Sequence, residues 1–212
     1  MRITAAIFAG DAAPRLVPAE LAEPGPDEVR VKLVATGICH TDAKAARAGG
    51  PVPHPVVLGH EGAGVVEAVG ARVRKVVPGD HVVLTFPSCG RCASCLEAEP
   101  AYCHDQFALN FLCEGHQVVE IDGGTVRSGF FGQSSFATHA IAGEIPVRKD
   151  AVLDLLGPLG CGIQTGAGAI LNDFRPQAGD ALAIFGVGSL GLSAVMAARL
   201  CGAGTIIAVD RQ

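Results

Sequence analysis

Hydrophobic and polar positions alternate through much of the first two thirds of the chain. In residues 28–35 (EVRVKLVA), valine and leucine alternate with arginine and lysine, which is typical of a strand with one buried face. Residues 62–69 and 81–86 predict further strands, the second introduced by the turn residues Pro78-Gly79-Asp80. The region from Ile3 to about Phe136 therefore predicts a compact β-barrel or sandwich. It is interrupted by a short helix over residues 41–48, with Thr41 or Asp42 near its cap.

A different pattern begins near Gly157. Residues 161–171 are small and apolar without alternation, and they predict a buried helix that ends near Asn172. Residues 181–185 (ALAIF) and 205–209 (TIIAV) are apolar throughout, and a helix is expected between them at about 190–200. Apolar strands joined by a crossover helix predict a parallel βαβ unit with a right-handed connection. The predicted fold class is thus α/β plus β.

Composition and charge exclude two classes of partner. The chain has 49% apolar and 17% charged residues, but charged residues and glycines break every apolar stretch well before the roughly 20 residues that a spanning helix needs. The net charge is -5, and no run of lysine or arginine offers a nucleic-acid footprint. The segment Met1-Arg2-Ile3-Thr4 reads as a strand rather than a secretory leader. We therefore expect a cytoplasmic protein that acts on a small molecule, without nucleic-acid or membrane partners.

Four cysteines lie close together at the spacing C-x2-C-x2-C-x7-C: Cys89, Cys92, Cys95 and Cys103. In a reducing compartment this spacing favours a thiolate metal site over disulfides. Four thiolates close a tetrahedron around Zn²⁺ and leave no position open for a substrate, so the site is expected to be structural. An iron–sulfur electron carrier is the alternative, because C-x2-C-x2-C also begins a ferredoxin ligand run. The seven-residue gap, and His104 where such a run has proline, argue against it.

A glycine-rich turn follows the first apolar strand. Gly186, Gly188 and Gly191 form G-x-G-x-x-G between that strand and the next helix, and Asp210 ends the second strand. This context favours a dinucleotide-binding turn over an ordinary glycine turn. An acid at position 210 would bind an adenosine ribose and repel a 2'-phosphate, so NAD is expected rather than NADP.

Three dispersed residues, Cys39, His60 and Cys161, form a second candidate metal set. Each alone is more often a core residue, but two thiolates and one imidazole leave zinc a fourth position for water or an alcohol oxygen. Residues 59–66 (GHEGAGVV) resemble the zinc signature of the medium-chain, zinc-dependent alcohol dehydrogenases. The remaining motifs follow in that family's order: Cys39-His40-Thr41-Asp42, the four cysteines, Gly160-Cys161-Gly162 and the nucleotide fingerprint.

The resemblance implies a fold and two zinc ions per chain. Residues 1–150 would form a GroES-like zinc-binding catalytic domain, and residues 151–212 would begin a Rossmann NAD-binding domain. Catalytic zinc on Cys39, His60 and Cys161 would activate an alcohol as its alkoxide. Glu61 would be an orienting residue or a transient ligand, and Thr41 would take the alcohol proton. Hydride would then pass to NAD, whose expected contacts are His40, Thr165, Gly186, Val187, Gly188, Leu190, Gly191 and Asp210.

Two further segments bear on the substrate. Residues 130–138 (FFGQSSFAT) and 162–168 (GIQTGAG) resemble the aryl-alcohol, or benzyl alcohol, dehydrogenase branch, which predicts an aromatic primary alcohol. The glutathione-dependent formaldehyde dehydrogenase branch is the competing interpretation, because both branches share the zinc motifs. Where horse-type members of the family have a histidine that ends the proton relay, this sequence has Lys44, which is not assigned a catalytic role.

The sequence stops at Gln212, directly after the second apolar strand. A dinucleotide-binding sheet of this type has about six strands, so we expect the chain to be the N-terminal part of a longer protein. The full-length protein is expected to be a homo-oligomer. The 212-residue chain alone is expected to bind zinc but to be catalytically feeble, and a non-catalytic zinc-binding fragment remains an alternative.

Overall fold

The computed structural model describes the whole chain except residues 11–12, 114–117, 122–123, 147–149 and 212. It divides into two compact units, Met1–Gly157 and Pro158–Gln212, which are described separately. The domain assignment made from the sequence, with its boundary at residue 150, stays a prediction. Within the described residues, no helix combines the length and the apolar character that crossing a membrane requires.

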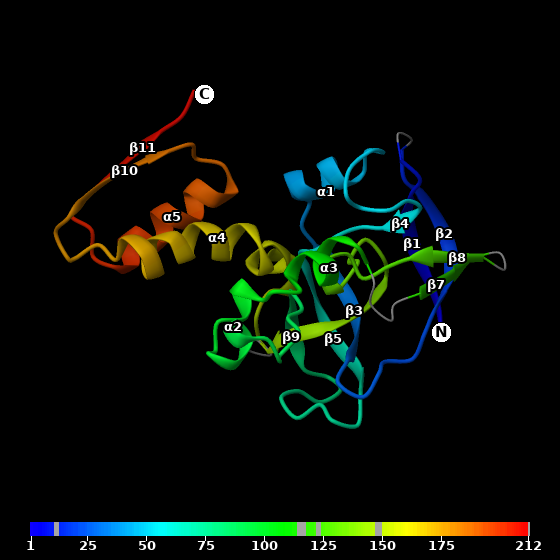
Figure 1. Cartoon of the computed structure of the whole chain (residues 1–212). Helices are drawn as coiled ribbons and strands as arrows, with labels where there is room; N and C mark the ends of the chain where they lie inside the picture. The colour runs from blue at the N-terminus through cyan, green and yellow to red at the C-terminus, as the bar shows by residue number, and fades with distance from the viewer. Residues whose placement is uncertain (11–12, 114–117, 122–123, 147–149, 212) are drawn as a thin grey trace. The chain divides into compact units, whose positions relative to one another are not determined.

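Strands dominate the first unit and close into two barrel-like sheets (Figure 1). The first sheet has the order β1-β2-β7-β8-β4, with β4 and β8 parallel, and the second has the order β3-β5-β6-β9. The predicted β-barrel is therefore confirmed. The strands are β1 (Arg2–Phe8), β2 (Arg15–Leu21), β3 (Val29–Thr36), β4 (Val56–Val57), β5 (Gly62–Val69), β6 (His81–Thr85), β7 (Val118–Ile121), β8 (Gly124–Arg127) and β9 (His139–Pro146).

The alternating pattern of β3 is visible in its burial. Val29 and Val31 are fully buried, whereas Lys32, the next residue along the strand, is exposed. β3 pairs antiparallel with β5 and β9, so its valines enter a core shared with residues of β5 and β6. Period-two alternation places one set of side chains on the core face, and this apolar face holds the barrel together. β6 ends at Thr85, one residue earlier than the sequence predicted.

Short helices lie between these strands or follow the last of them. They are α1 (His40–Ala45), α2 (Ala93–Leu96), η1 (Pro100–Tyr102), α3 (Gln106–Phe111), η2 (Phe130–Gly132), η3 (Leu153–Leu155) and η4 (Gly157–Gly160). The first of them begins at His40, so Thr41 and Asp42 lie in its first turn, near the cap as predicted. Cys39 is the N-cap of α1, and Asp42 lies inside the helix, where its carboxylate accepts the backbone N–H of Cys39 at 2.9 Å. The side chain therefore bonds back to the helix start, as in a capping box.

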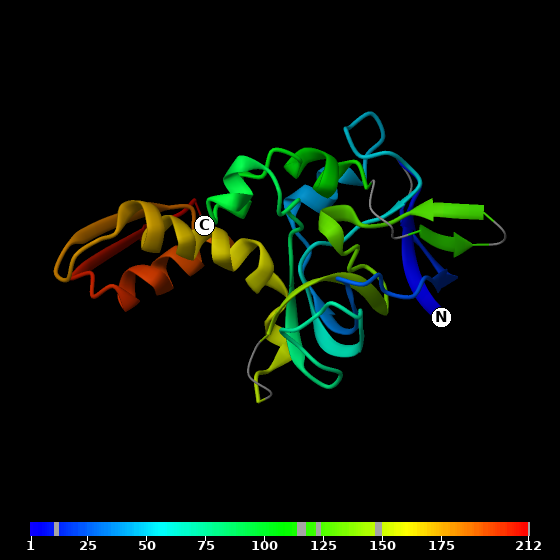
Figure 2. The same cartoon turned by 60° about the horizontal axis from the view of Figure 1, so that its bottom comes forward.

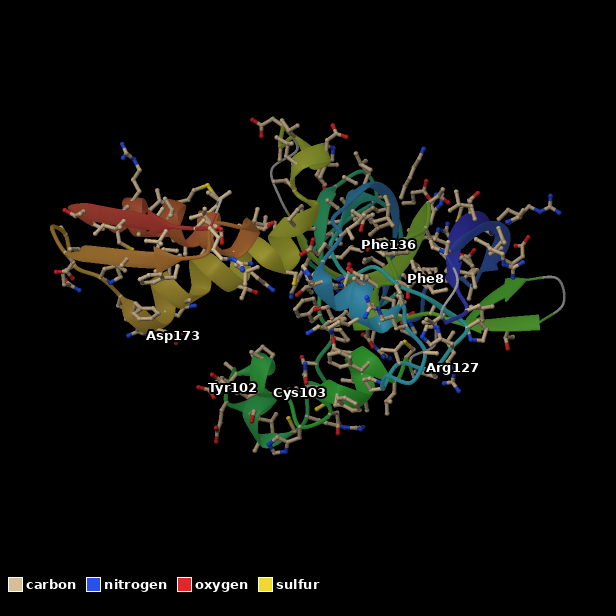
Figure 3. The ribbon with its side chains drawn as sticks, turned by 90° about the horizontal axis from the view of Figure 1, so that it is seen from above. Phe8, Tyr102, Cys103, Arg127, Phe136 and Asp173 are labelled. Carbon is tan, nitrogen blue, oxygen red and sulfur yellow. The ribbon has the colours of Figure 1, made fainter. Side chains whose placement is uncertain are left out.

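A third core cluster lies beside the first helix. It joins Val56 and Leu58 to the phenylalanines of η2, with Phe8 and Phe136 packed against it. Figure 3 shows Phe8 and Phe136 next to each other, and their ring centroids are 6.0 Å apart. This cluster fixes the chain just before His60, and so it positions the candidate site.

The second unit contains the predicted βαβ motif. β10 (Ala181–Phe185) and β11 (Thr205–Val209) pair in parallel, and α5 (Ser189–Leu200) connects them. α5 packs against both strands and against α4 (Gly162–Gly168), as Figure 2 also shows. Ala194, Ala197 and Ala198 of α5 form its buried face together with Ile170. Small alanine side chains allow helix and strands to approach closely.

The buried helix predicted for residues 161–171 is only half right. α4 continues as the π-helix η5 (Ala169–Phe174), and it ends where Arg175 adopts a left-handed conformation (φ 46°). Leu171 is 47% exposed and Phe174 is 73% exposed. The small apolar residues predict a buried helix, but α5 covers one side of this helix, where Ile170 packs. In the same way, Phe185 of β10 is 80% exposed.

Candidate functional site

The four-cysteine segment folds into a lobe whose sulfur atoms converge. The Sγ atoms of all four cysteines lie within 4.8 Å of one another, and those of Cys89 and Cys95 are 3.9 Å apart. Cys92 caps α2, which brings Cys95 back toward the start of the loop, and Cys103 follows η1. Cys103 is labelled in Figure 3 beside Tyr102, in the lobe that contains α2.

Backbone amides point at these sulfurs. The N–H groups of Cys89, Cys92 and His104 donate to the sulfurs of Cys103, Cys89 and Cys92 at 3.2, 3.4 and 3.5 Å, respectively. The bond from His104 is the main cause that lowers the pKa of Cys92 to about 6. Such donors stabilise thiolate charge. Four thiolate donors with amide support and no other protein ligand match what tetrahedral Zn²⁺ requires in a closed site.

Cys39, His60 and Glu61 form a second group in the first unit. One ligand atom from each lies within 4.8 Å of the others. Cys39 ends the loop before α1, and His60 and Glu61 directly precede β5. His60 is fully buried and Glu61 is 4% exposed. A half-buried thiol with a buried imidazole and a buried carboxylate at this separation is a donor set that fits Zn²⁺.

Asp42 organises this group, and the sequence reasoning missed that role. Its Oδ1 atom accepts from His60 Nδ1 at 3.0 Å and from the backbone N–H of Gly59 at 3.1 Å, and the whole residue is 3% exposed. With Nδ1 bonded to Asp42, Nε2 is the nitrogen of His60 that would bind a metal, and the hydrogen bond fixes the tautomer. A signal was present: an acid three residues after Cys39, at the third position of the helix.

The electrostatics around Cys39 favour its thiolate. Burial raises the pKa of Cys39, but hydrogen bonds from the backbone and hydroxyl of Thr41, together with the nearby His60, outweigh this and lower the pKa below its ordinary value. The Thr41 hydroxyl lies 3.6 Å from Cys39 Sγ. The predicted proton carrier is therefore adjacent to a predicted metal ligand. His40 and Lys44, on the same helix, are exposed.

Aromatic rings enclose His60, which the sequence reasoning also missed. The ring of Phe131 stacks on the imidazole with a centroid distance of 4.7 Å and an interplanar angle of 28°. Phe130 meets it edge-on at 5.8 Å, and Phe86 lies tilted at 6.3 Å. The imidazole is thus held between a carboxylate and apolar rings. No sequence motif predicts the contact of these rings with His60, because the rings come from segments far away in the sequence.

Cys161 belongs to the second unit, where it is the N-cap of α4. Its backbone carbonyl accepts both the N–H of Thr165 at 2.9 Å and the hydroxyl of Thr165 at 2.8 Å. The side chain of Thr165, the predicted nicotinamide contact, therefore bonds back to the preceding turn of its own helix. The participation of Cys161 in a metal site stays a prediction.

The nucleotide fingerprint has the conformation that its glycines require. Gly186 adopts φ +91°, and a Cβ at Gly191 would collide with the carbonyl oxygen of Gly186, so α5 approaches the turn as closely as backbone allows. A Cβ at Gly188 would meet no atom within 4 Å. The carboxylate of Asp210 accepts the N–H of Val187 at 2.7 Å and so ties the end of β11 to the turn. Leu190 is 49% exposed beside it.

Comparisons with known proteins identify relatives of this chain in sequence and in fold. The family model described as the alcohol dehydrogenase GroES-like domain matches residues 25–146. Among curated proteins, geraniol dehydrogenase of Castellaniella defragrans is 50% identical over 200 residues, which cover 91% of this chain and 53% of the relative. The class-3 alcohol dehydrogenase of Myxine glutinosa is 41% identical over 201 residues, with 91% and 53% covered. The chain thus spans about half the length of the curated relatives it matches.

Two solved structures show the same fold. An alcohol dehydrogenase zinc-binding domain protein from Burkholderia ambifaria superimposes with a TM-score of 0.94 at 52% identity, covering 99% of this chain and 59% of that one. Benzyl alcohol dehydrogenase from Acinetobacter calcoaceticus gives a TM-score of 0.91 at 45% identity, with the same two coverages of 99% and 59%. The predicted fold class, a GroES-like barrel followed by the start of a Rossmann domain, is confirmed.

Proposed function

Because this chain belongs to the medium-chain, zinc-type alcohol dehydrogenases, we propose that it carries the metal-binding and coenzyme-binding residues of an NAD-dependent oxidoreductase for primary alcohols. The observation that carries the proposal is the convergence of half-buried Cys39 with buried His60 and Glu61, with His60 oriented by Asp42. A thiol, an imidazole and a carboxylate that converge at one place are donors that a metal ion binds, so their convergence supports a metal centre.

The proposed catalytic ligands are Cys39, His60 and Cys161, with Glu61 as an orienting residue or transient ligand. When bound there, zinc would act as a Lewis acid that lowers the pKa of the substrate hydroxyl. Two thiolates and one neutral imidazole are the protein ligands of this kind of open site. The carboxylate of Asp42 keeps the proton on His60 Nδ1, so that Nε2 presents its lone pair.

Thr41 is the proposed first acceptor of the substrate proton. Its hydroxyl donates and accepts at once, and it lies 3.6 Å from Cys39 Sγ, so it stands beside the proposed metal site. Lys44 lies on the same helix but is exposed to solvent, which supports leaving it outside the relay. Protons would then leave through solvent or another base.

The four-cysteine lobe is proposed to hold a second, structural zinc. All four donors are thiolates, and a closed tetrahedral site contributes folding free energy without a position for substrate. The first unit would therefore hold the structural zinc, and it would also supply ligands for the catalytic zinc.

NAD is the proposed coenzyme. The turn of Gly186, Val187 and Gly188 leads into the N-terminus of α5, which is suited to a pyrophosphate, and His40 and Thr165 are proposed as further contacts. Asp210 lies at this turn through its bond to Val187 and would repel a 2'-phosphate. One solved structure with 28% identity was determined bound to NADP, so similarity of fold alone does not decide between the two coenzymes. The acid at position 210 is the feature that argues for NAD in this chain.

An aromatic primary alcohol is the proposed substrate class. The structural relative named benzyl alcohol dehydrogenase supports it. The relative named geraniol dehydrogenase favours a second candidate, an allylic alcohol. In both compounds the hydroxyl-bearing carbon is attached to an unsaturated carbon, so hydride removal gives a conjugated aldehyde.

The test uses the protein that carries this sequence, with benzyl alcohol, geraniol and ethanol as substrates and with NAD or NADP. Formation of reduced coenzyme is followed at steady state. We expect the largest kcat/KM for benzyl alcohol with NAD. His60→Ala is expected to lower kcat/KM at least 10³-fold, because the metal site loses a ligand. His139→Gln, a change on β9, is the matched control and should keep the activity.

Three results would each contradict part of the proposal. Equal activity of the wild type and His60→Ala would remove the metal site from the mechanism. A preference for NADP over NAD would refute the role given to Asp210. Geraniol oxidation with a larger kcat/KM than benzyl alcohol would replace the aromatic substrate class by the allylic one.

A further inference from the structure

The turn that carries Phe131 has an unusual backbone. Within residues 129–134, Gly129 (φ 94°), Phe131 (φ 48°), Gly132 (φ 64°) and Ser134 (φ 48°) all have positive φ. Glycine adopts this region readily, but phenylalanine does so only when its surroundings enforce it. Strain of this kind is kept where it places a side chain for a purpose.

The backbone conformation of this turn places the rings of Phe130 and Phe131 against the imidazole of His60. Phe131 stacks on His60 at 4.7 Å, and Phe130 meets the same imidazole at 84°. The two phenylalanines also pack against each other at 4.9 Å in an edge-on arrangement. Phe130 is fully buried and Phe131 is 7% exposed. The imidazole therefore lies against one ring face and one ring edge, both shielded from water.

Hydrogen bonds fasten this turn to the segment that carries His60. Ser134 Oγ accepts the N–H groups of Gly129 and Phe130 at 2.8 and 3.0 Å, and it donates to the carbonyl of Val57 at 2.5 Å. The two residues that follow continue the ladder: the N–H of Ser135 donates to Gly59 at 2.9 Å, and the N–H of Phe136 donates to Leu58 at 3.0 Å. The aromatic turn and the chain before His60 thus form one bonded unit.

We propose that Phe131 is a positioning residue for the metal ligand His60, which it holds at a fixed tilt by ring stacking; this inference rests on the proposed function. The hydrogen bond from His60 Nδ1 to Asp42 fixes one point of the imidazole but permits rotation about the axis of that bond. A ring stacked on the imidazole face opposes that rotation. Together the two restraints fix the direction of the Nε2 lone pair.

A positioning role for Phe131 can be distinguished from a packing role by measurement. A residue that only fills the core changes stability, whereas a residue that sets the tilt of His60 also changes metal affinity and ligand field. Phe136 provides the matched control, because it belongs to the same core cluster but its ring is paired with Phe8. Phe131→Leu and Phe136→Leu remove the same atoms from the same cluster.

The experiment replaces zinc by Co²⁺ and uses no turnover. His60→Ala first identifies the part of the Co²⁺ absorption that depends on the catalytic site; the remainder belongs to the four-cysteine lobe. Chelator competition, followed through that part of the absorption, then gives the dissociation constant of Co²⁺ at the catalytic site. For Phe131→Leu we expect this dissociation constant to rise about tenfold, because loss of a residue that orients a metal ligand typically weakens metal binding by that much. We also expect the ligand-field bands of Co²⁺ to shift. Phe131→Tyr keeps the stacked ring and should stay within about twofold of the wild type.

Phe136→Leu is expected to lose stability but to keep both the wild-type affinity and the wild-type spectrum. If Phe131→Leu has the affinity and spectrum of the wild type, the positioning role is wrong. It is equally wrong if Phe136→Leu loses as much Co²⁺ affinity as Phe131→Leu does. If Phe131→Leu does not fold, Phe131→Met, whose flexible chain fills the same space, is judged by the same criteria. If His60→Ala removes no Co²⁺ signal, the proposed function fails instead, which is a separate result.

Discussion

Asp42→Asn isolates the buried carboxylate on which the candidate active site depends. Asp42 accepts three hydrogen bonds: Oδ2 from the N–H of Cys39 at 2.9 Å, and Oδ1 from the N–H of Gly59 at 3.1 Å and from His60 Nδ1 at 3.0 Å. Asparagine has nearly the same shape but only one acceptor oxygen. If that oxygen stays on His60 and Gly59, the amide NH2 group faces the N–H of Cys39, and two donors then oppose each other.

The magnitude follows from these contacts. The bond to Cys39 is lost, and a hydrogen bond to a charged group is worth about 1.5–3 kcal/mol. The two bonds to His60 and Gly59 remain but become bonds between neutral groups, which are weaker by about half. We therefore expect the metal-free first unit to lose about 3–6 kcal/mol in free energy of unfolding. Zinc at the Cys39 and His60 site should bind about 10–100-fold more weakly, because His60 is less firmly oriented.

Scanning calorimetry and zinc–chelator competition measure the two effects. Calorimetry suits this chain because it contains no tryptophan for fluorescence. Asp27→Asn is the control: Asp27 is 64% exposed and forms an ion pair with Arg72, so its loss should change neither the unfolding transition nor zinc affinity. Zinc affinity in Asp42→Asn that equals that of the wild type would refute the orienting role of Asp42.

Three further predictions concern the coenzyme site and a buried thiol. Gly191→Ala should destabilise the second unit by about 1–3 kcal/mol in a calorimetric scan, because its Cβ collides with the Gly186 carbonyl, whereas Gly188→Ala should keep the wild-type transition and only weaken NAD binding in a titration. Asp210→Ser should improve NADP binding relative to NAD by roughly tenfold in equilibrium titrations, because the charge that repels a 2'-phosphate is gone; an unchanged ratio would contradict the assignment. Burial raises the pKa of Cys113 to about 11, so the folded state keeps this proton where the unfolded thiol ionises. Stability should therefore fall as pH rises from about 9 to about 11, and Cys113→Ala should show a smaller loss over that range.

The strands could be predicted from the sequence because each carries its own periodicity. The alternation in β3 and the apolar runs of β10 and β11 are local properties of a few residues, and the structure places strands there. Spacing also sufficed for the four cysteines, because residues so close together in the chain are brought together by short turns. The helix after Cys161 was harder, since its apolar composition did not reveal that one side is exposed.

The environment of His60 depends on contacts that no local pattern contains. The sequence predicts Asp42, or Thr41, near the cap of the first helix, because an acid near a helix start has that role most often. The bond that Asp42 forms to His60 is not part of that pattern. That bond spans 18 residues, and the stack of Phe131 on His60 joins parts of the chain even further apart. Such contacts depend on hydrogen bonds that join residues 133–136 to residues 57–62 outside the regular strand pairs.

The central claim, that this chain binds one structural and one catalytic zinc, is tested most directly by metal analysis of the purified protein and two variants. The wild type should contain two zinc ions per chain. Cys92→Ser should lose the ion of the four-cysteine lobe together with much of the stability, because metal binding there contributes folding free energy. Cys161→Ser should lose the other ion and remain folded. One zinc ion per wild-type chain, or two ions retained in Cys161→Ser, would contradict the account.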